Sequence, residues 1–265
     1  MKCLPICLLV GALYLTAHCD SALEAVTEDD SNVNIEYADP TLLLNNIQLS
    51  SKSTFARASA YGGELTRMHF MYGSTYQNAF NGSSFDNIHS NAYTKVFIDT
   101  QTLLSNTSSD AFYNHFGVAK ILKAYTMILM VDLFGDIPYS KSLDGTELNP
   151  PLQDDAFIYE EALKLLDEAI IDLENPVSLP GTETDLFFPN LSKSERIQAW
   201  KRVANTIKFK AYLNTREPEH INQLLSDGEL ILDHDHDFEF KYSTQLYLNS
   251  KSWSWSRINS PSDNN

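Results

Sequence analysis

The sequence is poor in cysteine and in positive charge, and each shortage excludes a class of protein. Its three cysteines are Cys3, Cys7 and Cys19, so none is left further along the chain to build a disulfide framework. Lysine and arginine number 19 against 35 aspartate and glutamate residues, which gives a net charge of −16. Such a field repels a phosphate backbone, so nucleic acid is not expected as a partner.

Long hydrophobic runs are also missing. A helix that crosses a bilayer needs about 20 consecutive apolar residues. The apolar run from Leu4 to Leu15 is shorter, and the uncharged stretch from Ala124 to Val131 is shorter still. A positive start at Met1-Lys2, a short apolar run and the small residues before Cys19 are typical of an export signal. We therefore expect residues 1–18 to be a signal peptide and to take no part in the fold.

Cys19 stands directly after this leader and leaves two possibilities open. A bacterial lipoprotein signal resembles the arrangement, and in such a protein the cysteine is acylated and anchors the chain to the membrane. His18 and the position of Leu15 depart from the usual lipoprotein pattern. The alternative is ordinary secretory cleavage a few residues further on, which leaves no anchor.

The remaining chain divides by composition into three parts. Residues 19–39 are acidic and polar, which predicts an extended tether. Residues 40–240 carry apolar side chains at helical spacing, and residues 241–265 predict an irregular segment. Helices are expected over about 41–60, 111–134, 155–174, 192–216 and 220–231.

Residues that begin or end helices support these ranges. Pro40 suits a first turn, Asp154 or Asp155 can cap the helix that follows, and Ser192 or Ser194 can cap the next. Gly135 can adopt the left-handed conformation that ends a helix. Successive amphipathic helices without strands between them predict a mainly α fold of stacked helix pairs, of the tetratricopeptide type.

Three stretches together resemble one family. The stretch from Ala119 to Ser140 contains Asp-Leu-Phe-Gly-Asp-Ile-Pro-Tyr, and it is similar to the helix and turn of SusD/RagB-like outer-membrane lipoproteins, in particular the second SusD-like subfamily. Residues 155–173 and 200–216 resemble two further helices of that family. Members are usually much longer, so the resemblance implies an N-terminal portion of the SusD-like fold with its C-terminal part incomplete. It also favours acylation of Cys19.

The same resemblance implies a function. Family members bind glycans or other nutrients at the cell surface, over a TonB-dependent (SusC-like) transporter in the outer membrane, and they are not enzymes. We therefore expect a lipid-anchored, surface-exposed protein that delivers oligosaccharide to such a transporter. The alternative is a helical-repeat adaptor that binds only protein, with aromatic residues as interface anchors.

Two groups of aromatic residues are candidates for ligand binding. An aromatic face packs against the apolar side of a sugar ring while amides bind its hydroxyl groups. On a helix Tyr72, Tyr76 and Phe80 would share one side, with the amide of Asn78 among them; the alternative is that this stripe belongs to the core. Trp253 and Trp255 would lie on one side of the chain if it is extended, and the alternative is that they pack against the missing C-terminal part.

Three further motifs have structural interpretations that we favour over chemical ones. We expect Asp136 to hold the Gly-Asp-Ile-Pro turn by accepting backbone hydrogen bonds, rather than to form a catalytic pair with Asp132. The run from Asp233 to Asp237 fails the spacing of a calcium loop and predicts a solvated loop instead of a metal site. Seven cations between residues 193 and 216 are expected to balance the acidic helix at 155–174.

Motifs for catalysis are lacking. The sequence has no Gly-x-Ser-x-Gly elbow, no phosphate-binding glycine loop and no His-Glu-x-x-His motif, and Cys19 is the last cysteine. We expect neither a cofactor nor a catalytic site. A secreted hydrolase remains a third possibility, because two carboxylates suffice for a glycosidase.

Overall fold

The computed structural model describes residues 39–70, 80–105, 112–143, 145–177 and 185–242. The chain divides into two units, Met1–Ala38 and Asp39–Asn265, and all described residues belong to the second. The predicted signal peptide, the tether up to Ala38 and most of the segment 241–265 lie outside the described residues. These three assignments stay predictions.

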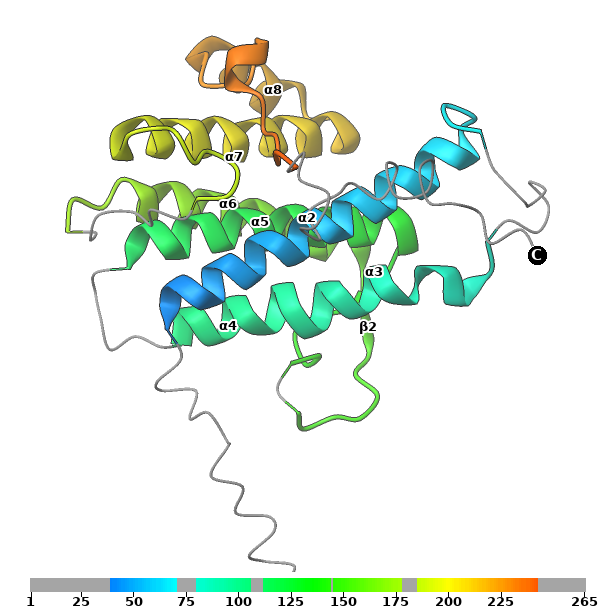
Figure 1. The fold of residues 1–265 in the computed structure, drawn as a ribbon. Helices are drawn as coiled ribbons and strands as arrows, with labels where there is room; N and C mark the ends of the chain where they lie inside the picture. Colours follow the sequence, from blue (N-terminus) through cyan, green and yellow to red (C-terminus); the bar gives the residue numbers. More distant parts are fainter. Residues whose placement is uncertain (1–38, 71–79, 106–111, 144, 178–184, 243–265) are drawn as a thin grey trace, which may run out of the picture. The chain divides into compact units, whose positions relative to one another are not determined.

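The described chain is mainly helical, which confirms the predicted fold class (Figure 1). A single π-helical turn, η3, lies between α3 and α4, and the two short strands form an antiparallel pair in which Ile137 lies opposite Gln153. The α-helices and strands in chain order are α2 Pro40–Leu65, α3 Asp86–Asn91, α4 Ile98–Ser105, α5 Tyr113–Phe134, β1 Ile137–Pro138, β2 Leu152–Gln153, α6 Asp155–Leu173, α7 Lys193–Thr215 and α8 Pro218–Asp227.

Local hydrogen bonds explain where several helices begin and end. Asp154 caps α6 by accepting a hydrogen bond from the N–H of Ala156, so it is Asp154 and not Asp155 that fills this role. Ser192 and Glu195 form a reciprocal capping box at the start of α7. Gly135 ends α5 as predicted; its φ of 72° is positive, but its ψ of −132° differs from that of the left-handed helical conformation.

Two expectations about the helices need correction. The last helix ends at Asp227 and does not extend to Ile231, because Gly228 adopts a φ of 69° and turns the chain away. Residues 86–105 form a helical stretch that the sequence analysis did not predict. The π-helical turn Ala92–Phe97 inserts an extra residue there, so the apolar positions do not keep a period of 3.6. The short β1–β2 pair was not predicted either.

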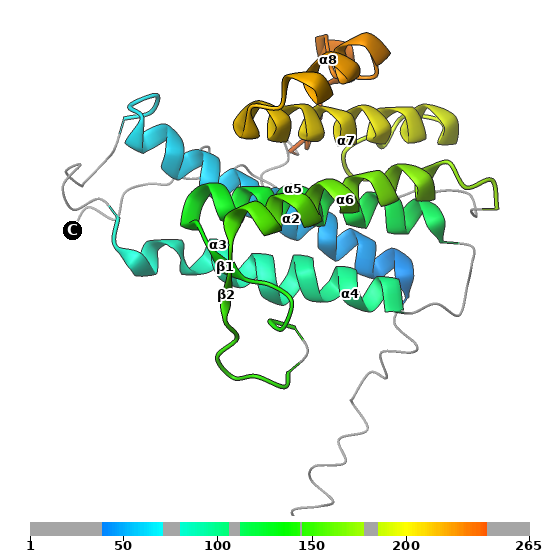
Figure 2. The same cartoon turned by 180° about the vertical axis from the view of Figure 1, so that it is seen from behind.

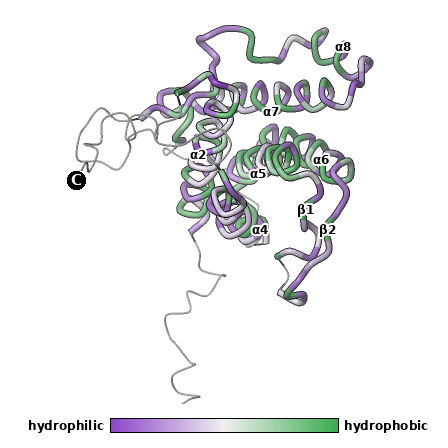
Figure 3. The backbone as a smooth tube through the Cα atoms, turned by 90° about the vertical axis from the view of Figure 1, so that its right-hand side faces the viewer, coloured by the Kyte–Doolittle hydropathy of each residue, from purple (hydrophilic) through white to green (hydrophobic). Residues whose placement is uncertain are grey.

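The α-helices pack as successive pairs around α5 (Figures 1 and 2). Helix α6 lies along α5, α7 packs on α6, and α8 packs on α7, while α2 and α4 cover the other side of α5. In Figure 3 the tubes of α5 and α6 carry mainly hydrophobic residues. Fully buried side chains from both helices form the centre of the core: Ile121, Leu122, Met127, Ile128, Met130, Ile158 and Leu166. The predicted stacking of helix pairs is confirmed.

No helix in the described part of the chain combines the length and the hydrophobicity that a bilayer crossing requires.

Candidate functional site

The first candidate site is a cleft of about 570 Å³ between α2, α5 and the extended chain before Tyr242, and we call it the aromatic cleft. Helix α2 crosses α5 here, and the chain that follows α8 returns beside them. The aromatic rings therefore come from parts of the sequence that are far apart. The residues that define the cleft are Lys52, Phe55, Tyr125, Phe238, Phe240 and Tyr242.

Residues 236–242 alternate between half-buried and exposed positions. His236, Phe238, Phe240 and Tyr242 are half-buried, whereas the residues between them are exposed. Successive side chains of an extended chain point to opposite sides, so this segment turns one row of rings toward the helices. Sequence reasoning missed this part of the site, although the alternation Phe-Glu-Phe-Lys-Tyr was visible.

Ring contacts fix the floor of the aromatic cleft. Phe55 on α2 stacks on Tyr125 of α5, with ring centres 4.3 Å apart. Phe240 meets Tyr242 edge to face at 5.2 Å. All four rings are half-buried, so each keeps some surface available to a ligand. The arrangement combines apolar ring surface with two phenol groups.

Lys52 is a polar group at the same cleft. Its Nζ lies 4.9 Å from the ring centre of Phe240 and 4.8 Å from that of Tyr242, which is the distance of a cation–π contact. Burial lowers the pKa of Lys52 and raises the pKa of Tyr242. Nζ of Lys210 lies 5.7 Å from the ring centre of Tyr125, and it forms an ion pair with Asp132 at 3.3 Å.

A second cleft of about 470 Å³ lies between the loop after residue 185, the first turns of α7 and the extended segment, and we call it the polar cleft. Phe187 and Glu239 line both clefts, so the two are neighbours. Phe187 and Phe188 are each 7% exposed and form an apolar floor. Asn190, Gln198 and Arg202 stand on its walls.

Asp185 holds the loop that forms this floor. Its carboxylate is 6% exposed and accepts a hydrogen bond of 2.7 Å from Nε1–H of Trp200. The same carboxylate accepts the backbone N–H groups of Phe187 and Phe188, at 3.0 and 2.8 Å. Three donors on one buried carboxylate fix the two rings in place before any ligand arrives.

Of the residues predicted to bind ligand, the structure describes only Phe80. Phe80 is half-buried, and its ring packs on Tyr61 at 4.7 Å and on Phe85 at 5.9 Å. It does not line either cleft. The other predicted site residues lie outside the described residues, and their roles stay predictions: Cys19, Tyr72, Tyr76, Asn78, Trp253 and Trp255.

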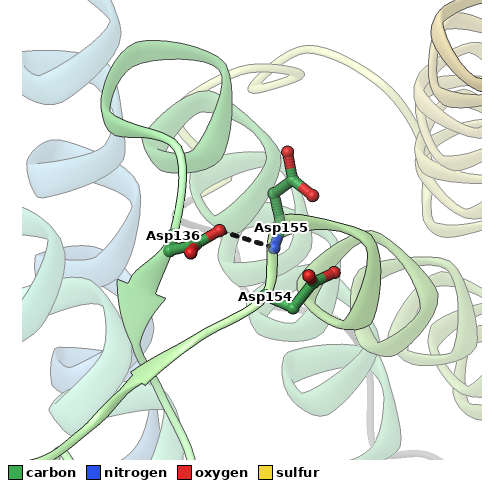
Figure 4. Close-up of side chains that lie close together, drawn as sticks. All are labelled: Asp136, Asp154 and Asp155. Carbon is green, nitrogen blue, oxygen red and sulfur yellow. Dashed lines mark hydrogen bonds between the residues drawn. The ribbon is translucent and has the colours of Figure 1, made fainter.

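The turn after α5 has the structural role that the sequence predicts. Oδ1 of Asp136 accepts a hydrogen bond of 3.2 Å from the backbone N–H of Asp155, and it thereby ties the turn to the start of α6 (Figure 4). Ligand oxygens of Asp136, Asp154 and Asp155 lie within 4.8 Å of one another, but all three residues are exposed. The carboxylates of Asp136 and Asp154 are explained by the backbone N–H groups that they accept at the start of α6.

Asp132 has other partners and does not pair with Asp136. Oδ1 of Asp132 accepts a hydrogen bond of 2.5 Å from the hydroxyl of Tyr159, which also accepts one of 3.0 Å from Asn214. Burial and the hydrogen bond to Asp132 raise the pKa of Tyr159 to about 12. Through these contacts Asp132 connects α5 to α6 and α7.

Part of the predicted charge balance between α7 and the acidic helix α6 is present, whereas Lys210 of α7 pairs with Asp132 of α5 instead. Lys201 pairs with Glu174 at 2.7 Å, and Lys208 pairs with Asp167 at 2.5 Å. The run from Asp233 to Asp237 contains the short turn η4, His234–His236, and its residues other than the half-buried His236 are exposed, in agreement with the solvated-loop interpretation. In it His234 pairs with Asp237 at 3.0 Å.

Comparison with known families matches residues 32–227 to the model of a SusD-like family described as "Starch-binding associating with outer membrane". Comparison with curated proteins gives no match.

Solved structures show the same fold at low sequence identity. A SusD/RagB family protein from Bacteroides thetaiotaomicron has a TM-score of 0.69 at 16% identity, over 84% of this chain and 49% of that one. A SusD homologue from Bacteroides fragilis has a TM-score of 0.57 at 21% identity, over 77% of this chain and 44% of that one. A chitin-binding SusD homologue from Flavobacterium johnsoniae has a TM-score of 0.53 at 20% identity, over 63% of this chain and 36% of that one. The chain thus spans half or less of the length of these proteins.

Proposed function

This chain belongs to the SusD-like family, and from that premise we propose that it is a surface-exposed lipoprotein that binds glycans and delivers them to a TonB-dependent, SusC-like outer-membrane transporter. Family members are binding proteins rather than enzymes, so the proposed mechanism is reversible binding without cleavage. The observation that carries the proposal within this chain is the aromatic cleft.

The aromatic cleft has the chemistry that sugar binding needs. Half-buried rings of Phe55, Tyr125 and Phe240 offer apolar faces for the C–H side of a pyranose. The ammonium group of Lys52 can donate hydrogen bonds to sugar hydroxyls, and the phenol groups of Tyr125 and Tyr242 can donate and accept them. A volume of about 570 Å³ falls in the range of ligand sites.

The predicted site residues, all but Phe80 outside the described part, complete the proposal. We propose that Tyr72, Tyr76, Asn78 and Phe80 contribute to glycan binding, as do Trp253 and Trp255. We also propose that an acylated Cys19 anchors the chain in the outer membrane. Of these residues Phe80 is described, and its ring packs on that of Tyr61 in α2, with ring centres 4.7 Å apart.

Isothermal titration of the full chain against a glycan panel tests the proposal. Maltoheptaose and chitohexaose are the first probes, because the family description names starch and a similar structure is named as chitin-binding. We expect heat with at least one glycan, and a tenfold or greater loss of affinity in Phe240→Ala. Lys164→Ala on the exposed side of α6 is the control. If no glycan in the panel gives heat, the proposal fails.

The protein-binding adaptor is a second candidate with its own observation. A groove of about 450 Å³ lies between α6, α7 and α8, and in it Tyr212 stacks on His220 at 4.6 Å. Tyrosine is a frequent anchor residue in protein interfaces. Capture of an outer-membrane transporter by a chain that binds no glycan would favour this function over the first.

A further inference from the structure

We propose that the polar cleft is a second saccharide-binding site, separate from the aromatic cleft and built mainly to bind hydroxyl groups. The inference rests on the proposed glycan-binding function, because it takes the same class of ligand. It adds a site that the proposed function does not use.

The first argument is that the walls of the polar cleft carry side chains with hydrogen-bonding capacity to spare. Asn190, Gln198 and Arg202 line it, and within the described part of the chain their side chains form no hydrogen bond or ion pair. An amide offers both donors and acceptors, and a guanidinium offers a planar fork of donors. Neighbouring hydroxyl groups of a sugar match these groups.

The second argument comes from the contrast with other cations on α7. Lys208 and Lys210 form ion pairs with acids of α6 and α5, and Lys201 pairs with Glu174 at the C-terminal end of α6. Arg202 follows Lys201 directly, and one residue turns the helix by about 100°, so Arg202 points to a different side. Arg202 is half-buried and lines the polar cleft, whereas the three lysines form ion pairs within the fold.

The third argument is that the cleft is formed before binding. Asp185 accepts hydrogen bonds from Trp200, Phe187 and Phe188, and Gln48 of α2 accepts the N–H of Leu186 at 2.9 Å. The apolar floor is therefore fixed to both α7 and α2. A preformed floor reduces the entropy that a ligand must lose on binding.

The opposite wall defines the ligand class. Glu239 and Lys241 point away from the buried row of rings and also line the polar cleft, together with Asp235 and Asp237. Carboxylates accept hydrogen bonds from hydroxyl groups, and they disfavour an anionic ligand. The combination of amides, one guanidinium and carboxylates over an apolar floor fits a neutral saccharide and not an acidic one.

The test is isothermal titration of the full chain with maltoheptaose and chitohexaose, comparing wild type, Arg202→Ala/Gln198→Ala, Phe240→Ala and the control Lys164→Ala. We expect wild type and control to bind at two sites, each cleft variant to keep one site, and the combination of all three cleft substitutions to abolish binding. Arg202 and Gln198 make no side-chain bonds to the described residues, so circular dichroism should show an unchanged fold.

The outcomes separate this inference from the proposed function. If wild type binds glycan at a single site, and Arg202→Ala/Gln198→Ala changes the affinity of that site by less than twofold, the second site is refuted. The proposed glycan binding then stands. Loss of affinity for a polyuronate upon Arg202→Ala, without any effect on the neutral probes, overturns the assigned ligand class. Absence of heat with every glycan in wild type overturns the proposed function as well.

Discussion

Asp185 shows how one residue supports both the core and a candidate site. It is a buried carboxylate with three donors, of which one is the indole of Trp200, itself 1% exposed. Burial of a charge is costly unless hydrogen bonds compensate it, and here they do. The position of the polar cleft's floor follows from this residue.

We expect Asp185→Ala to lower the free energy of unfolding by about 3 kcal/mol or more, because it leaves buried N–H donors without acceptors. Urea denaturation followed by circular dichroism measures the change. Asp235→Ala is the matched control on the exposed side of the same cleft, and we expect it to stay within about 0.5 kcal/mol of wild type. Equal stability of the two variants would contradict this account.

His115 makes stability depend on pH. Its side chain is buried at 3% exposure, and burial lowers its pKa to about 4, against a smaller opposing effect of Asp39. Between pH about 6.5 and about 4 the unfolded chain therefore binds a proton that the folded chain does not. The folded state loses stability as the pH falls through this window, and it loses none above it.

We expect the fall in unfolding free energy between pH 7 and pH 4 to be smaller in His115→Gln than in wild type, by up to about 3 kcal/mol. Denaturation curves at several pH values give the difference. His220→Gln serves as the control, since His220 is exposed. Parallel pH profiles for wild type and His115→Gln would show that the burial of His115 has no such effect.

At the scale of the elements, the pairing of α5 with α6 depends on one close approach. Gly117 of α5 faces Leu173 of α6, and a Cβ atom at position 117 would lie 2.6 Å from Leu173 Cγ and 3.0 Å from the carbonyl oxygen of Ala169. The two helix backbones can meet there because glycine has no side chain. Glycine at this point is a packing requirement and not a matter of backbone conformation.

We expect Gly117→Ala to destabilise the chain by about 1–3 kcal/mol, because the added methyl group forces α5 and α6 apart. Thermal denaturation compared with wild type measures it. Gly62→Ala in α2 is the matched control, since nothing lies within 4 Å of a Cβ there and alanine favours the helix. We expect that variant to be as stable as wild type or slightly more so. A neutral Gly117→Ala would refute the close contact.

At the scale of the whole molecule, the net charge of −16 is distributed unevenly. The cations of α7 neutralise acids of α5 and α6, as in the pairs Lys208–Asp167 and Lys210–Asp132. The acids of the polar cleft, such as Asp235 and Glu239, have no such partner helix. The lining of the polar cleft thus carries four acids against the two cations Arg202 and Lys241, which suits neutral ligands better than acidic ones.

The proposed membrane anchor is tested on the intact chain. We expect wild type, expressed in a bacterium that processes lipoproteins, to partition into the membrane fraction with a mass increase on Cys19. Cys19→Ala should move to the soluble fraction, because the acyl chains provide the binding free energy to the bilayer. Cys7→Ala is the control within the predicted leader. A free Cys19 thiol on a soluble wild-type chain would refute the anchor.

Helix boundaries were predictable where a local signal decides them. The caps at Asp154, Ser192 and Gly135 act through atoms a few residues away, and the sequence narrows each N-cap to one of two neighbouring candidates. The helical stretch 86–105 was missed because its π-helical turn breaks the apolar period that sequence reading depends on. The predicted site residues other than Phe80 lie outside the described part, so the sequence remains their only support.

The sequence by itself determined the mainly helical class, the main helices and the family, because periodicity, capping residues and the Asp-Leu-Phe-Gly-Asp-Ile-Pro-Tyr turn are short-range features. Only the tertiary structure decided where the clefts lie. Lys52 contacts Phe240, and Gln48 accepts a hydrogen bond from Leu186, although the partners in each pair are far apart in the sequence. Such contacts arise when helices bury their apolar faces against one another, and no local pattern specifies which distant residues then become neighbours.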